Sequence, residues 1–237
     1  MRSIKAWKAP SALAAGVLAA LAVNPAVAGG QYVVDDAELI DPRSCEVEVW
    51  HTNIDGGGYG TFVSPTCRLD SMFQATFTAG FLREDGENEQ EYGIELKTLF
   101  YEMDRHGYGL GLVVGTEYLT ESSRWETLFA NAPFSMELVP DQVMFHANVG
   151  VERDRGEDDR TAFTWGLGTE VGFGGPVGLV AEVFGDSRSG SDPVLQIGPR
   201  FALLDDRLVL DLTYGRELTS GGEKAYSVGV SFVAFEF

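Results

Sequence analysis

The last fourteen residues, 224-KAYSVGVSFVAFEF-237, alternate apolar and small polar side chains in the manner of one β-strand. One face carries Phe237, Phe235 and Val233, and the other carries Phe232 and the alternate residues before it. A β-bulge near Val233–Ala234 would restore one continuous apolar face through Phe232. The stretch therefore predicts a closing strand, either of a membrane barrel or of a soluble β-sandwich.

A closing strand that ends on Phe237 resembles the C-terminal strand of Gram-negative outer-membrane β-barrels, which the barrel-insertion machinery reads. The resemblance implies that Phe237, Phe235 and Val233 form the insertion signal. It also implies a protein that lies among outer-membrane lipid and lipopolysaccharide.

The other end of the chain favours the membrane barrel. Three basic residues precede an apolar run at Ala12–Val23, and Ala26-Val27-Ala28 is a small-x-small cleavage site. Residues 1–28 are therefore predicted to be a signal peptide that is removed after export through the Sec pathway. The apolar run is too short for a membrane span of about 20 residues.

Composition indicates an all-β protein. The chain has 237 residues with 29 glycines, 11% aromatic residues and a formal net charge of −19, which becomes −22 once the three basic residues of the signal are removed. Glycines and aromatic residues at strand spacing, without a helical period, are typical of β-strands. So negative a chain argues against nucleic acid as a partner.

Residues 29–43 lack periodicity and are predicted to be a periplasmic tail, and residues 44–237 contain about twelve alternating segments. Each is close to the 9–11 residues that a tilted strand needs to cross a bilayer. We expect a single antiparallel transmembrane β-barrel of about 12 strands, with 10 as the alternative. The segments are Ser44–Asn53, Tyr59–Cys67, Ser71–Arg83, Glu89–Glu102, Gly107–Leu119, Arg124–Leu138, Gln142–Arg153, Thr161–Phe173, Val177–Phe184, Pro193–Leu204, Arg207–Glu217 and Lys224–Phe237.

The connections alternate between short and long, as in barrels with short periplasmic turns and longer, here acidic, outer loops. The predicted short links are Asp104–His106, Pro140–Asp141, Gly174–Pro176 and Asp205–Asp206. The predicted long links are Glu84–Asn88, Thr120–Ser123, Asp154–Arg160, Gly185–Asp192 and Leu218–Glu223.

The two cysteines test the register of the first hairpin. Gly56 is midway between Cys45 and Cys67, so the two should face each other across the strand pair. Opposed residues lie at a distance that suits a disulfide, and the export route is oxidising. We expect a Cys45–Cys67 disulfide, with two free thiols as the alternative.

The polar face of these segments is predicted to line the lumen. One interpretation is a ladder of ion pairs that fills a narrow barrel, and the other is a water path that favours cations. The predicted lumen-lining residues are Glu46, Glu48, Glu95, Lys97, Glu137, His146, Glu170, Glu182, Gln196, Arg200, Arg207 and Asp211.

Catalytic and cofactor motifs are not evident. His146 and Asn148 share a face, as in an outer-membrane phospholipase, but no serine is placed to pair with them by sequence. No metal or cofactor is predicted, and a lipid-modifying enzyme is the third hypothesis.

Several motifs resemble a group of uncharacterised proteobacterial outer-membrane proteins, and the likeness covers most of the chain after the signal. The resemblance implies a porin-like protein related to transport. We therefore expect a narrow pore for small solutes that favours cations, with a closed structural or adhesion barrel that binds cations or a partner through acidic loops as the alternative. The motifs are Asp35-Asp36-Ala37, Cys45-Glu46-Val47-Glu48-Val49-Trp50, Val63-Ser64-Pro65-Thr66-Cys67, Thr164-Trp165-Gly166-Leu167-Gly168-Thr169-Glu170, Ala181-Glu182-Val183-Phe184-Gly185-Asp186 and Asp211-Leu212-Thr213-Tyr214-Gly215.

Overall fold

A computed structural model of the chain describes residues 31–68, 72–84, 86–156, 160–204 and 207–236. The predicted signal peptide and Phe237 lie outside these ranges. None of the helices in the described residues has the length and apolar composition needed to cross a membrane.

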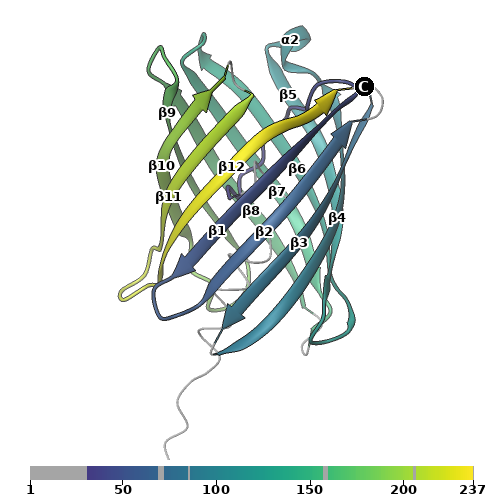
Figure 1. Cartoon of the computed structure of the whole chain (residues 1–237), viewed down its shortest axis with the longest axis vertical. Coiled ribbons are helices and arrows are strands. Elements are labelled where there is room, and N and C mark those ends of the chain that lie inside the picture. Colours follow the sequence, from purple (N-terminus) through teal and green to yellow (C-terminus); the bar gives the residue numbers. More distant parts are fainter. Residues whose placement is uncertain (1–30, 69–71, 85, 157–159, 205–206, 237) are drawn as a thin grey trace, which may run out of the picture.

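Twelve antiparallel strands close into one barrel, in which each strand pairs with its sequence neighbours and β1 pairs with β12 (Figure 1). The prediction of a single all-β barrel with 12 strands is confirmed, and the alternatives of 10 strands and of a sandwich are wrong. A single helical turn, α2 (Met103–His106), joins β4 to β5. The strands are β1 Ser44–Ile54, β2 Tyr59–Arg68, β3 Phe73–Glu84, β4 Glu87–Tyr101, β5 Tyr108–Leu119, β6 Arg124–Val139, β7 Val143–Asp154, β8 Arg160–Gly172, β9 Val177–Asp186, β10 Val194–Leu203, β11 Leu208–Glu217 and β12 Lys224–Glu236.

The wall is apolar outside and polar inside. On β3, Phe73, Phe77 and Phe81 are 48%, 46% and 55% exposed, whereas the alternate residues Gln74 and Thr76 are buried. Successive side chains of a strand point to opposite faces, so the hydrophobic face of each strand is turned outward and the polar face inward. This arrangement is the reverse of a soluble β-protein and suits a barrel surrounded by lipid.

The closing strand contains the expected bulge. Cys45 of β1 pairs with Phe235 and Glu46 pairs with Val233, so Ala234 has no opposite residue. The extra residue turns Phe232 and Phe235, which are 39% and 56% exposed, to the same outer side. Whether this end acts as an insertion signal stays a prediction.

Two rims follow from the connections. The short-turn rim carries α2, residues 140–142 and 173–176, Leu204, Arg207 and the end of β12, and the long-loop rim carries residues 120–123, 155–156, 187–193 and 218–223. One link is shorter than expected. Glu84 pairs with Glu87, so the polar residues predicted to form a loop there extend β3 and β4 instead.

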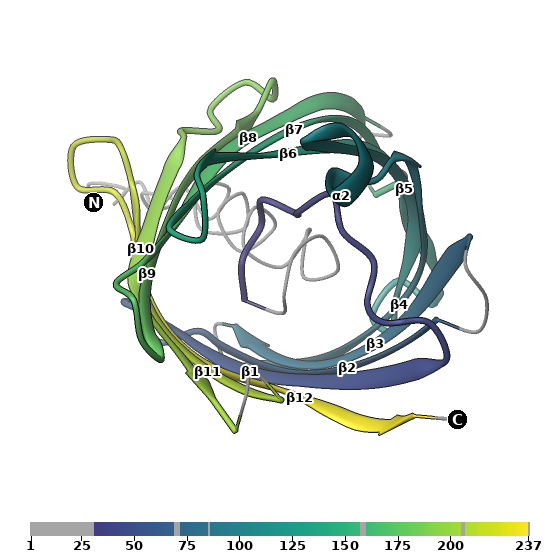
Figure 2. The same cartoon turned by 90° about the horizontal axis from the view of Figure 1, so that it is seen from above.

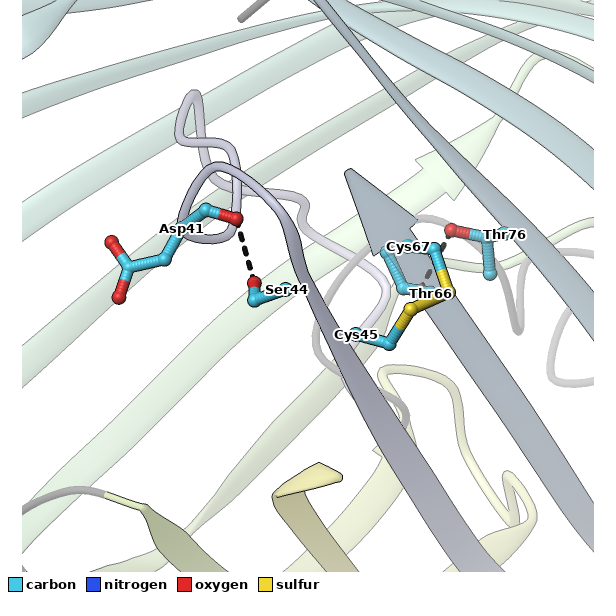
Figure 3. The surroundings of a disulfide bond; sticks show 6 residues. All are labelled: Asp41, Ser44, Cys45, Thr66, Cys67 and Thr76. Atoms are coloured by element: carbon cyan, nitrogen blue, oxygen red, sulfur yellow. Dashed lines mark hydrogen bonds between the residues drawn. A yellow bond between two sulfur atoms is a disulfide. The ribbon is translucent and has the colours of Figure 1, made fainter. Parts of the chain in front are cut away.

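A disulfide joins the first two strands at the short-turn rim, as the register predicts (Figure 3). Cys45 and Cys67 are directly opposed, with a Cα–Cα distance of 4.1 Å.

The segment before β1 lies inside the barrel, where we expected an outside tail. Residues 31–42, here called the plug, cross the interior and turn into β1 at the short-turn rim (Figure 2). Tyr32, Val34, Asp35 and Ala37 are buried. The plug forms no strand, which explains why its sequence lacks the periodicity of a strand.

Candidate functional site in the barrel lumen

The inner wall is a continuous polar surface built by the alternation of the strands. Two hydroxyl pairs cross from β2 to β3, with Ser64 Oγ 2.9 Å from Thr78 Oγ1 and Thr66 Oγ1 2.8 Å from Thr76 Oγ1. Such cross-strand pairs satisfy polar groups without requiring solvent. The side chains of the lumen can therefore bind a polar segment or a polar solute.

A carboxylate of the wall binds the main chain of the plug. The amides of Val33 and Val34 each donate to an oxygen of Glu182, and both N–O distances are 2.9 Å. Glu182 is 3% exposed. Hydrogen bonds to an ionised acceptor are stronger than those between neutral groups, so Glu182 binds this part of the plug through two strong contacts.

Three neutral side chains continue this pattern toward the short-turn rim. Asn148 both accepts from the amide of Asp35 and donates to its carbonyl, at 2.8 Å each. Ser135 Oγ accepts from the amide of Ala37 at 2.7 Å, and Gln74 Oε1 accepts from the amide of Ile40 at 3.0 Å. The wall thus satisfies plug amides that a strand would pair with its neighbours.

Charge complements these contacts. Lys97 Nζ lies 2.8 Å from Asp35 Oδ1 and 3.0 Å from Asp36 Oδ1, and the Lys97 and Asp35 side chains are 4% and 5% exposed. Burial raises the pKa of Asp35 to about 7, and the Lys97 charge opposes that rise. The ion pair links the plug to β4.

Tyr32 fixes the inner end of the plug against β10 and β11. Its hydroxyl lies 3.4 Å from Asp211 Oδ1, and the Arg200 guanidinium lies 5.1 Å from its ring centroid. Burial, followed by the charge of Asp211, raises the pKa of Tyr32, so the phenol stays protonated and can donate. Arg200 also binds Asp211 and Glu170, at 3.0 and 2.8 Å.

Glycines in the wall make room for the plug. A Cβ added at Gly109 would lie 2.4 Å from the carbonyl oxygen of Ala37, and one added at Gly166 would lie 2.7 Å from Cγ2 of Val34. At Gly229 it would lie 2.7 Å from Oε1 of Gln31. The absence of a side chain at these inward positions is therefore what allows close approach of the plug.

The predicted lumen-lining residues fall into three groups. Glu95, Lys97, His146, Glu182, Gln196 and Asp211 are buried in the wall, and Glu46, Glu48, Glu170 and Arg200 are half-buried. Glu137 and Arg207 are exposed. Glu137 lies where the pairing of β6 with β7 shifts near the rim, and Arg207 precedes β11, so neither keeps the strand alternation on which its prediction depended.

A serine does meet His146, which corrects the sequence analysis. Ser135 on β6 is directly opposite His146 on β7, and its Oγ lies 2.8 Å from His146 Nδ1. Their 11-residue separation conceals the contact in the sequence, because it depends on strand register. Ser135 is fully buried and its hydroxyl also accepts from the plug, so in this state the pair forms part of the plug-binding wall.

Several buried polar residues of the wall were not among the predicted lumen-lining residues, and they include Glu91, Glu117, Asn131 and Glu152. Glu91 has the same alternation as Glu95 and Lys97 on β4, and that signal was sufficient to find it. Within the described ranges, no group of three or more His, Cys, Asp or Glu side chains is arranged to hold a metal ion.

Comparison with known proteins places this barrel among outer-membrane folds. A family model described as Uncharacterised conserved protein UCP029691 matches residues 16–234, and no curated protein gave a match. The KdgM porin structure matches with a TM-score of 0.65 and 10% identity, over 81% of this chain and 99% of that one.

Two further structures give similar values. The NanC porin has a TM-score of 0.61 and 10% identity, over 78% of this chain and 98% of its own. The COG4313 outer membrane channel from Pseudomonas putida F1 has a TM-score of 0.57 and 10% identity, over 84% and 98%. At this identity the likeness shows a porin-like fold alone.

Proposed function

The chain belongs to the family described as Uncharacterised conserved protein UCP029691, and we propose that it forms a gated channel for small solutes in the outer membrane. In this proposal the signal peptide directs export, the short-turn rim faces the periplasm, and the barrel is inserted among lipid and lipopolysaccharide. The gate is the plug. The porin-like fold and the polar inner wall support the proposal.

The observation that carries the proposal is the way the plug is held. Among the described residues, no main-chain to main-chain hydrogen bond joins residues 31–40 to the wall, and the contacts come from wall side chains instead. Each strand of the wall has its two neighbours without the plug. The plug can therefore leave while every strand pairing is kept, and a polar path is then left behind.

The charge of the vacated lumen favours cations. Buried acidic residues of the wall outnumber Lys97, the one lysine or arginine buried in the described part of the wall, and Arg200 is already paired with Glu170 and Asp211. Rings of carboxylates select cations in narrow pores. One solved KdgM structure is described as a complex with oligogalacturonate. An acidic lumen repels such an anion, so we propose small cationic or neutral solutes here.

Conductance in planar bilayers tests the proposal. A variant lacking residues 31–40 should give stable conductance steps and a reversal potential that favours K⁺ over Cl⁻, whereas the full-length protein should conduct in rare openings. Circular dichroism and heat-modifiable migration on gels show whether the deleted protein still forms the barrel. A folded deletion variant without conductance steps would remove the channel proposal.

A closed structural barrel is the second candidate, because the plug fills the lumen with specific contacts rather than loosely. In that case the plug is a permanent part of the fold. The deletion variant should then lose much of its thermal stability, and the full-length protein should show no openings at any voltage.

A further inference from the structure

A second feature of the lumen is a pocket between the plug and the long-loop rim. It is partly open to solvent. Phe129 of β6 and Phe184 of β9 are buried in its wall, and Val33 of the plug lines it. This mixture of apolar walls with a few polar groups suits a small molecule.

Arg188, from the connection after β9, lines the pocket with its positively charged side chain. The Arg188 guanidinium contacts the carboxylate of Glu152 on β7, and its Nη1 lies 3.0 Å from Asp186 Oδ2 at the end of β9. Glu152 is 2% exposed. Two carboxylates on separate strands thus already form a cradle for a planar cationic group.

The cradle is not fully used. Among the described residues, the second carboxylate oxygen of Glu152 has no hydrogen-bond partner. A buried, unpartnered carboxylate oxygen is costly and attracts a donor, most strongly a charged one. Counting Glu152, Asp186 and Arg188, the charged groups of the pocket leave one net negative charge.

We propose that this pocket binds small organic cations, namely alkylammonium or alkylguanidinium ions, with the charge on Glu152 and Asp186 and the alkyl part against Phe129 and Phe184. Arg188 holds the same carboxylates in the absence of ligand and competes with it. The use of this pocket for solute recognition rests on the proposed channel function, whereas the binding of an organic cation to the pocket does not.

Isothermal titration calorimetry of the full-length, detergent-folded protein with n-butylguanidinium and n-butylammonium tests the site. Glu152→Gln should weaken binding about tenfold or more, since it removes a charge-assisted contact. Arg188→Gln should strengthen binding by about tenfold, since it removes the competing cation. Asp192→Asn is the matched control, because Asp192 is an exposed acid in the same connection and does not line the pocket.

The two substitutions have opposite expected signs, so a general loss of folding cannot imitate the result. Equal binding by the wild type and Glu152→Gln, weaker binding by Arg188→Gln, or no saturable binding of either cation would overturn the proposal. If the full-length protein binds the cations saturably but the plug-deletion variant does not conduct, the binding-site proposal stands and the channel proposal is wrong. If the deletion variant conducts but the full-length protein does not bind the cations, only the binding-site proposal is wrong.

Discussion

The wall and the plug are parts of one chain that are held by different kinds of contact. In the wall each strand is bonded through main-chain ladders to two neighbours, and the ring closes where β1 meets β12. The plug lies within this ring and is held by wall side chains such as Glu182 and Asn148. Ladders are cooperative, whereas side-chain contacts can be lost one at a time, so the plug is expected to move before the wall opens.

Loss of the lysine that pairs with the plug should give the largest effect on gating. Lys97→Met leaves Asp35 buried without its counter-charge, which disfavours the seated plug by about 3 kcal/mol and raises the open fraction about a hundredfold. The measurement is open probability in planar bilayers. Adding Asp35→Asn should restore closure in part, and Lys224→Met, on an exposed rim, should leave gating unchanged. An unaltered open probability in Lys97→Met would show that the ion pair does not hold the plug.

Loss of the carboxylate that binds two plug amides should have the next largest effect. Glu182→Gln keeps one hydrogen bond, to its amide oxygen, and turns an NH2 group that cannot accept toward the other plug amide, which disfavours the seated plug by about 2 kcal/mol. Limited proteolysis of the plug should report this as faster cleavage. Glu91→Gln is the matched control, because Glu91 is equally buried in the lumen and, among the described residues, forms no hydrogen bond or ion pair with residues 31–42. Equal cleavage rates in the two variants would contradict the role of Glu182.

A methyl group added at Gly109, where the wall closely approaches the plug, should have a somewhat smaller effect on gating. In Gly109→Ala the new Cβ would meet the Ala37 carbonyl oxygen at 2.4 Å, so plug or wall must shift, at about 1–2 kcal/mol. Gly93→Ala provides the control, because its Cβ would meet Thr78 Cβ at an ordinary 3.4 Å. Open probability should rise in the first variant and stay unchanged in the second. A larger rise in open probability in Gly93→Ala than in Gly109→Ala would mean that the plug does not pack against Gly109.

The disulfide should affect the wall and leave gating nearly unchanged. Replacing Cys45 and Cys67 by serine frees the loop between them and should lower the free energy of unfolding by about 3 kcal/mol. Chemical unfolding followed by tryptophan fluorescence measures that change. Open probability should stay at the wild-type value, since the plug contacts of Glu182 and Lys97 lie elsewhere on the wall. A large rise in open probability would instead show that the disulfide-linked ends of β1 and β2 help to hold the plug.

The barrel can be predicted from the sequence because the alternation of residues along a β-strand shows its two faces locally. Alternation along segments such as Phe73–Glu84 predicts which side faces outward, and the midpoint between Cys45 and Cys67 predicts their pairing. The bulge at Ala234 was likewise readable from the apolar residues on either side of it. Each of these features depends on residues close in the chain or on the symmetry of one hairpin.

The segment that fills the lumen could be identified only from the folded structure. Val33 and Glu182 are 149 residues apart, and Ala37 and Ser135 are 98 apart, so no local pattern marks their contact. Gly109 and Gly166 had the alternation of ordinary strand glycines, and their role as clearance for the plug depends on which residues lie opposite them across the lumen. A segment held by side chains has no period of its own, and its place is fixed only after the wall that carries those side chains has closed.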